Sequence, residues 1–98
     1  MDKNTSKDQL LIAKVSGRRL IYDDGAKQSL SADGSTVYNE GRDSKGFWKV
    51  ENGRFYSQWP PSTHWASYTL TDRIEDGKIV GVTFTGERGD SFSGVFTE

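Results

Sequence analysis

The residues best suited to contact a ligand gather between Phe55 and Tyr68. This segment contains two of the three tryptophans, both prolines and the only histidine of the chain. The prolines stiffen the link between two predicted strands, so aromatic side chains at its ends can form a rigid wall around a ligand. Alternatively, Trp59 and Trp65 flank a turn and pack into the core, since a chain poor in apolar residues needs its rings inside. The candidate ligand-binding residues are Tyr56, Trp59, His64, Trp65 and Tyr68.

Few residues have the types and spacing of a catalytic or metal site. His64 could act as an acid, a base or one metal ligand, but a zinc site needs two or three further ligands and none is spaced close by. The chain has no cysteine, which excludes disulfides, thiol catalysis and Cys-ligated metal. We therefore expect no catalytic residue, no metal and no cofactor. An enzyme that uses His64 with a nearby carboxylate remains the alternative.

Composition limits the partners of the chain. Its 98 residues include 13 basic and 14 acidic ones, spread along the sequence, and the net charge is −1. No basic face suited to phosphates is visible, so nucleic acid is not an expected partner. No apolar run approaches the roughly 20 residues of a membrane-spanning helix. The start, Met1-Asp2-Lys3-Asn4, lacks the apolar stretch of a signal peptide, so we expect any such peptide to be absent from this chain.

Four Asp-Gly or Asn-Gly pairs separate short runs of alternating apolar and polar residues, at residues 24–25, 33–34, 52–53 and 76–77. Tight two-residue turns need positive φ, which Gly adopts freely and Asn or Asp tolerate, so these pairs predict β-hairpins. The alternation predicts about eight strands. Their expected ranges are 18–23, 26–30, 36–40, 47–51, 54–59, 65–72, 78–85 and 91–97.

The N-terminal segment predicts a short helix from Ser6 to Val15. Ser6 and Gln9 fit a capping box, and Gly17 would end the helix. The alternative is that Leu10–Val15 forms the first strand. Residues 1–5 are polar and are expected to be a flexible terminus.

The predicted elements make one mainly β domain over residues 1–98. Gaps of two to six residues suit hairpins and leave no room for the crossover helices of a parallel sheet. We expect an antiparallel meander that forms a small closed or partly open barrel, with a sandwich as the alternative. Closure is favoured because it removes exposed strand edges. The short helix could then plug one end.

Two resemblances follow from the aromatic motifs. Gly46-Phe47-Trp48 resembles the G-x-W signature of lipocalins and related calycin barrels, in which the Trp closes one end of the barrel; in lipocalins it lies on the first strand, and here at mid-chain. A longer stretch, from Gly17 to Tyr68 through Tyr56-Ser-Gln-Trp-Pro-Pro and Trp65-Ala-Ser-Tyr, is similar to small exported proteobacterial domains without an assigned activity. This likeness implies a periplasmic or secreted location.

The leading functional hypothesis is a non-enzymatic module of β-barrel type that binds a small apolar or carbohydrate-like ligand at its aromatic-rich turn. The alternative is a protein-interaction domain, such as an inhibitor or envelope accessory protein, that uses exposed aromatic residues or a strand edge. The absence of a reactive group of residues favours both over an enzyme.

Overall fold

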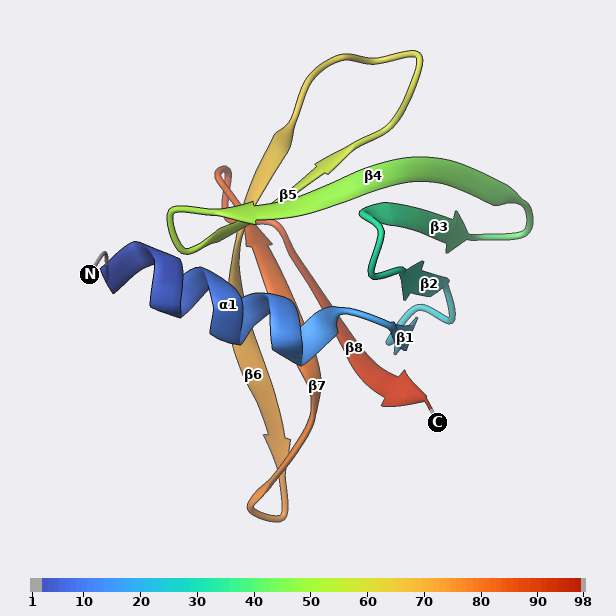
Figure 1. Cartoon of the computed structure of the whole chain (residues 1–98). Coiled ribbons are helices and arrows are strands. Elements are labelled where there is room, and N and C mark those ends of the chain that lie inside the picture. The colour runs from blue at the N-terminus through green and yellow to red at the C-terminus, as the bar shows by residue number, and fades with distance from the viewer. Residues whose placement is uncertain (1–2, 98) are drawn as a thin grey trace.

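The chain folds as one N-terminal helix followed by eight antiparallel strands, which close into a barrel in sequence order (Figure 1). The computed structural model describes the backbone of residues 3–97 and the side chains of residues 7–97. The predicted mainly β meander is confirmed, and the barrel is closed. The elements are α1 (Lys3–Val15), β1 (Arg18–Tyr22), β2 (Lys27–Leu30), β3 (Ser35–Asn39), β4 (Asp43–Glu51), β5 (Arg54–Gln58), β6 (Ala66–Glu75), β7 (Lys78–Gly86) and β8 (Ser91–Thr97).

The four Asp-Gly and Asn-Gly pairs all lie at hairpin turns, but they form two kinds of turn. Asn52-Gly53 and Asp76-Gly77 are two-residue turns in which both residues have positive φ, 53° and 76°. At Asp24-Gly25 and Asp33-Gly34 only the glycine has positive φ, 91° in each. The preceding aspartates of these wider turns accept a hydrogen bond from the backbone two residues on, at 3.0 and 2.9 Å. The sequence pairs therefore predict the hairpins, and the aspartate caps select the wider turns.

Closure comes from pairing of the first and last strands. β1 and β8 are antiparallel neighbours from Arg19 opposite Thr97 to Tyr22 opposite Gly94. This pairing satisfies backbone groups that would otherwise lie on two open edges. Most predicted strand limits differ from the structure by at most one residue, and two are wrong by more: β4 begins earlier, at Asp43, and β6 extends to Glu75. Both additions are polar segments that pair with β3 and β7, so tertiary pairing extends strands that the sequence pattern does not mark.

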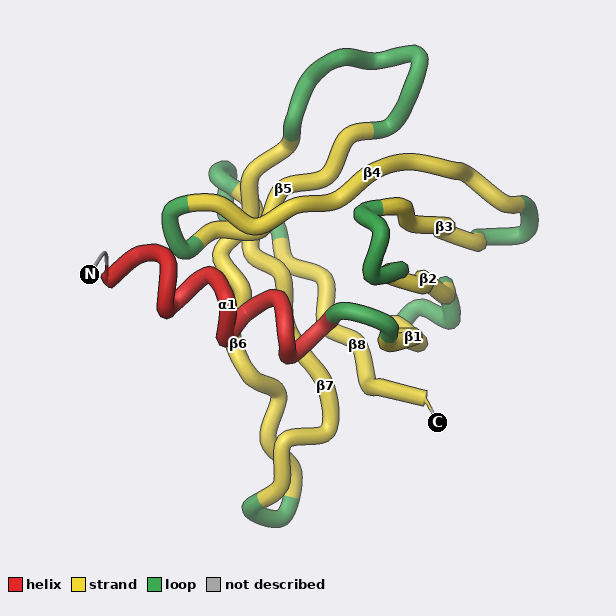
Figure 2. Tube along the Cα trace, in the orientation of Figure 1, coloured by secondary structure: helices red, strands yellow, loops and turns green. Residues whose placement is uncertain are grey.

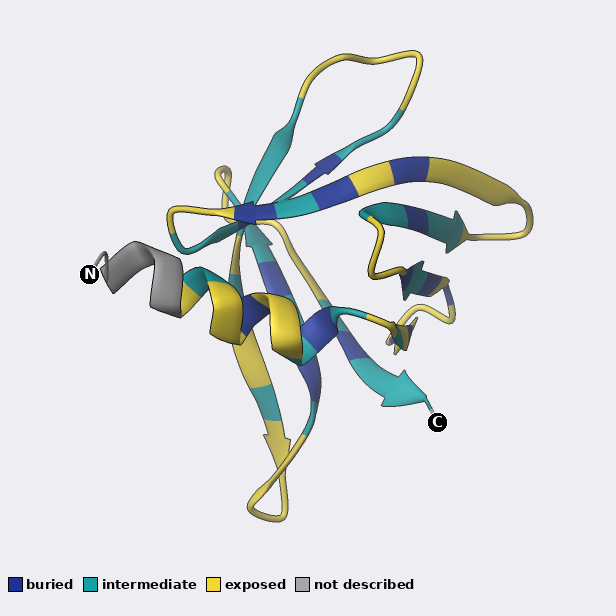
Figure 3. Ribbon diagram, in the orientation of Figure 1, coloured by how far each residue is buried: buried dark blue, intermediate teal, exposed yellow. Residues whose placement is uncertain are grey.

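The β6–β7 hairpin is longer than the barrel wall needs. β5 pairs with β6 only over residues 66–68, whereas β7 pairs with β6 over residues 68–75. The far part of the hairpin therefore projects from the barrel, as the yellow strands at the bottom of Figure 2 show. Most of its residues are exposed (Figure 3).

Helix α1 packs on the barrel at the β4–β5 turn. Leu11 and Val15 are buried in the core, which fits the predicted plug (Figure 3). The Asp8 carboxylate accepts hydrogen bonds from the backbone N–H groups of Asn52 and Gly53, at 3.0 and 2.6 Å. These bonds attach the helix to a turn far away in the sequence.

The alternative of a first strand over Leu10–Val15 is wrong, because this segment is helical. The helix begins at Lys3 rather than at Ser6, so Ser6 does not mark its start. The Ser6 side chain that the predicted capping box requires lies outside the described residues. Of the predicted flexible terminus, residues 1–2 also lie outside them, and the backbone of residues 3–5 belongs to the helix.

Large aromatic side chains form much of the core, as the composition predicts. Trp48 is 6% exposed, its ring stacks on Phe55 with centroids 5.9 Å apart, and Phe55 contacts Phe84 edge to face at 4.8 Å. The indole N–H of Trp48 donates to the Ser31 carbonyl at 2.9 Å. Phe47, one residue earlier, points outward and is 48% exposed. The two-residue periodicity of β4 thus places one of the two adjacent rings inside the barrel.

Candidate functional site

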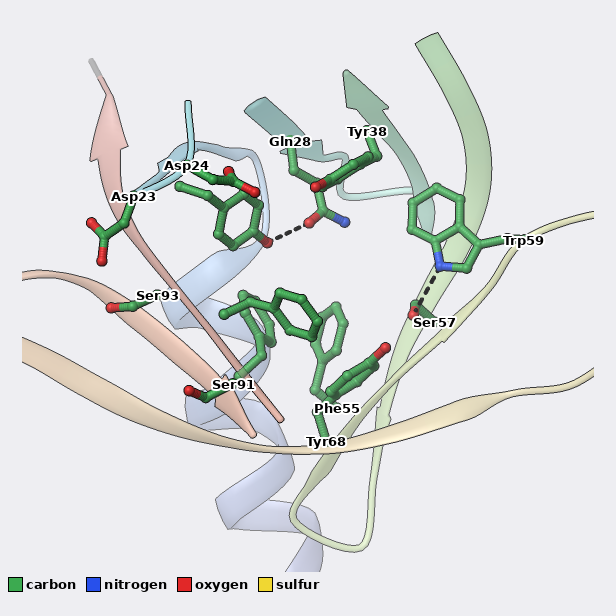
Figure 4. Close-up of a pocket in the computed structure, with 13 residues that line it drawn as sticks. Asp23, Asp24, Gln28, Tyr38, Phe55, Ser57, Trp59, Tyr68, Ser91 and Ser93 are labelled. Carbon is green, nitrogen blue, oxygen red and sulfur yellow. Dashed lines mark hydrogen bonds between the residues drawn. The ribbon is translucent and has the colours of Figure 1, made fainter. Parts of the chain in front are cut away.

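A cavity of about 480 Å³ lies in the barrel at the end away from helix α1. β5 starts beside the helix-bound turn at Gly53 and runs toward the cavity, where Ser57 and Trp59 form part of the wall. The other wall residues come from strands on all sides of the barrel (Figure 4). The rings that line the cavity are Tyr22, Tyr38, Phe55, Trp59, Tyr68, Phe84 and Phe92, and the main polar residues are Asp24, Gln28 and Ser57.

A chain of hydrogen bonds runs through one wall of the cavity. The Tyr22 hydroxyl donates to Gln28 Oε1 at 2.5 Å (Figure 4). Gln28 Nε2 donates to Thr36 Oγ1 at 2.9 Å. Thr36 in turn donates to the Ser29 carbonyl at 2.7 Å. All three hydrogen bonds are donated in the same direction, from Tyr22 toward Ser29. The Tyr22 oxygen can therefore accept a further hydrogen bond, and the second N–H of the Gln28 amide can donate one.

Beside this hydrogen-bonded chain, the rest of the cavity wall is largely aromatic. Trp59 meets Tyr38 edge to face, with ring centroids 6.2 Å apart and an interplanar angle of 72°. Tyr68 meets Phe92 in the same way, at 6.4 Å and 77°. The Trp59 indole donates to Ser57 Oγ at 3.2 Å, which leaves the serine hydroxyl free to donate. The rings therefore present both faces and edges to the cavity.

Gly46 of β4 makes room for the Trp59 ring. A Cβ atom at this position would lie 2.6 Å from Trp59 Cε3 and 2.4 Å from the Gln58 carbonyl oxygen. Gly46 lies inside β4, and the side chain that it accommodates is one of the candidate site residues.

The charge near the cavity is negative. Asp23 is paired with Arg73, whose Nη1 lies 2.7 Å from its carboxylate. Within the described part of the chain, Asp24 accepts only the backbone N–H of Ala26, at 3.0 Å. Burial raises the pKa of the Tyr22 phenol well above its usual value, and the charges of neighbouring groups, Asp24 among them, raise it further. Burial also raises the pKa of Tyr38, with charge contributions from Glu40 and Asp24. Both hydroxyls therefore stay protonated at neutral pH.

The structure divides the predicted ligand-binding residues between two faces. Trp59 and Tyr68 line the cavity. Tyr56 and Trp65 lie outside the barrel, where the Lys49 ammonium sits 5.5 Å from the Tyr56 ring and 4.5 Å from the Trp65 ring. His64 is exposed in the loop after β5. Neither Trp59 nor Trp65 belongs to the buried core, so the alternative that both pack there is wrong.

The division follows from strand periodicity. In β5 the buried residues are Phe55 and Ser57, so Tyr56 between them points outward. Sequence reasoning that treats residues 55–68 as one cluster groups side chains from opposite faces.

Several cavity residues lie far from that cluster in the sequence: Tyr22, Gln28, Tyr38, Phe84 and Phe92. A partial signal exists for Tyr22, which shares the inward face of β1 with Leu20 and directly precedes a turn. The same alternation brings Phe84 inward on β7. No signal in the sequence shows which strands meet across the barrel, so the set as a whole requires the structure.

Within residues 7–97, no group of three or more His, Asp or Glu side chains is arranged to hold a metal ion. No helix in the described part of the chain has the length and apolar character needed to cross a membrane. Comparison of the chain with protein-family models, curated proteins and solved structures gives no match.

Proposed function

We propose that this protein is a non-enzymatic module that binds a small ligand in the cavity of its barrel. The observation that carries the proposal is a space of about 480 Å³ bordered by seven aromatic rings and a few oriented polar groups. Its size lies in the range of about 300–1,000 Å³ that is typical of small-molecule sites. The polar groups offer both an acceptor, the Tyr22 oxygen, and donors, at Ser57 and Gln28.

Nothing among the described residues points to catalysis. The one histidine, His64, is exposed, and its imidazole makes no hydrogen bond or ion pair with any other residue in the described part of the chain. The cavity wall carries no histidine, lysine or cysteine that could act as a base or nucleophile. Binding without turnover is therefore the activity that these groups best support.

The test compares two tryptophans of the same loop. Trp59→Ala removes a wall of the cavity, whereas Trp65→Ala removes a ring from the outer surface and serves as the matched control. Backbone-amide NMR shifts of the wild type are followed against a panel of small apolar, aromatic and carbohydrate ligands. We expect saturable shifts around the cavity, and about ten-fold weaker binding in Trp59→Ala alone. Equal losses in both variants, or a panel without any saturable response, would contradict the proposal.

A second candidate function, binding of a protein partner, is supported by the edge of β6. Beyond residue 68, no described strand pairs with the side of β6 that faces away from β7. Near the end of this hairpin, Ile74 and Ile79 face each other across the two strands and are 61% and 55% exposed. An added strand could pair with this edge. The two-residue turn at Asp76-Gly77 makes Glu75 and Lys78 a hydrogen-bonded pair, so the N–H of Ile74 faces the open edge. Ile74→Pro would remove this edge N–H and should abolish partner capture while the cavity titrations stay unchanged.

A further inference from the structure

The cavity wall has an unbalanced charge. Of its lining residues, Asp23 and Asp24 alone carry a formal charge, and no lysine, arginine or histidine is among them. Asp23 is neutralised by Arg73, which also donates to Glu75. Asp24 has no ion-pair partner among the described residues, and its single hydrogen bond, from the Ala26 backbone, leaves the net negative charge in place. Figure 4 shows the Asp24 side chain among those that line the cavity.

The uncharged groups of the wall are also electron-rich. The Tyr22 hydroxyl donates its proton to Gln28, so its oxygen can only accept a hydrogen bond from a ligand. Tyr38 and Trp59 stand nearly perpendicular to each other, as do Tyr68 and Phe92, so ring faces approach the space from different directions. The face of an aromatic ring attracts a cation within about 6 Å of its centroid.

Asp24 is exposed at the turn between β1 and β2, where it lines the cavity, and its charge adds to the effect of burial on Tyr22 and Tyr38. The Asp24 carboxylate contributes to the raised pKa of both phenols. A negative charge that disfavours a phenolate in the wall also favours a cation in the space between them. An anionic ligand would meet the opposite effect, and few donors offset it.

We propose that the cavity binds an organic cation, an ammonium group on an apolar body, with the charge between Asp24 and the ring faces of Tyr38 and Trp59. This inference rests on the proposed function and names its ligand class. Tyr22 Oη would accept a hydrogen bond from a ligand N–H or a polarised C–H. The apolar body would contact Phe55 and Phe84 deeper in the barrel.

The test uses three probes that share a benzyl group and differ in the charge of its substituent: benzyltrimethylammonium, its neutral carbon isostere neopentylbenzene, and the anion phenylacetate. Each is titrated into the full chain at low ionic strength and followed by backbone-amide NMR shifts. We expect the ammonium to bind at least about ten-fold more tightly than the neutral isostere, and its affinity to fall as salt is added. Phenylacetate should bind most weakly.

Asp24→Asn removes the charge and keeps the side-chain oxygen that caps Ala26. The control, Asp33→Asn, makes the same change at a turn of the same kind that is not part of the cavity wall, where Asp33 caps Ser35 at 2.9 Å. Asp24→Asn should weaken ammonium binding about ten-fold and leave the neutral probe unchanged. Asp33→Asn should change neither, and unchanged amide spectra would show that both variants fold.

The outcomes separate the two levels of the proposal. If the neutral isostere or phenylacetate binds as tightly as the ammonium, or if Asp24→Asn leaves ammonium affinity unchanged, the cation inference is overturned and the proposed function stands. If the ammonium causes no saturable shift at millimolar concentration, the cation inference is overturned as well. Absence of binding by these probes and by the whole ligand panel overturns the proposed function too.

Discussion

Replacement of Trp48 tests the inward orientation of β4 and the aromatic core together. Trp48 is 6% exposed, so Trp48→Ala removes a side chain that buries about 200 Å². At about 25 cal/mol per Å², this burial contributes about 5 kcal/mol to the free energy of unfolding. Loss of the hydrogen bond to Ser31 adds about 1 kcal/mol. Residual burial in the unfolded chain lowers the total, so we expect a loss of about 4 kcal/mol in the free energy of unfolding.

The assay is urea unfolding at 25 °C, followed by far-ultraviolet circular dichroism because the variants alter tryptophan fluorescence. A domain of 98 residues has a free energy of unfolding of about 5–15 kcal/mol, so Trp48→Ala is expected at the edge of folding. Trp48→Phe keeps the stacking on Phe55 and loses the indole N–H, and should cost about 2 kcal/mol.

Trp65→Ala is the control, because this ring lies outside the barrel below Lys49. It should cost no more than about 1 kcal/mol, the worth of an exposed cation–π contact. Cooperative unfolding of Trp48→Ala with a loss below about 1 kcal/mol would refute the core placement of Trp48. Equal losses in Trp48→Ala and Trp65→Ala would refute the distinction between an inner and an outer ring.

Three further changes test the cavity wall, the helix contact and the close approach of β7 and β8. Because burial raises the folded-state pKa of Tyr22, the stability that Tyr22 contributes is complete below about pH 10 and decreases above it by up to about 1.4 kcal/mol per pH unit. Tyr22→Phe should therefore reduce the fall of the urea unfolding midpoint between about pH 9 and 11. An unchanged slope of midpoint against pH would contradict this. Asp8→Ala removes the carboxylate that accepts the Gly53 N–H at 2.6 Å and should cost about 1–3 kcal/mol by urea unfolding, with faster amide exchange in α1; unchanged exchange would count against the contact. In Gly81→Ala a Cβ would lie 1.9 Å from the Gly94 carbonyl oxygen, so we expect a loss of about 1–3 kcal/mol or more, and full wild-type thermal stability would refute the close β7–β8 approach.

Much of the fold follows from local chemistry. Asn52-Gly53 and Asp76-Gly77 reverse the chain because glycine and asparagine or aspartate accept positive φ, and the strands between such turns alternate at a period of two. The α1 prediction also succeeds, since Leu10–Val15 lies in the helix, although the helix begins earlier than Ser6. Helix starts are difficult to predict here because polar residues before Ser6 continue the helix without a marked cap.

The candidate site is predicted only in part. Tyr68 lines the cavity because β6 carries it inward, and Trp59 does so from the loop directly after β5, whereas Tyr56 and Trp65 occupy the outer face. Proximity in the sequence suggests one cluster of rings. Alternation within β5 would have separated Tyr56 from Phe55, and that rule is visible in the sequence. The loop residue Trp65 has no such periodic signal.

The sequence by itself determines the hairpins, the antiparallel pairing and the reliance on aromatic side chains, because turn conformation, strand periodicity and composition act over short distances along the chain. Only the tertiary structure decides that Tyr22 of β1 shares a cavity with Tyr68 of β6, and that α1 packs at the far end. These arrangements depend on the register in which β1 pairs with β8 to close the barrel. Register is set by all the cross-strand contacts together, so no short segment encodes it.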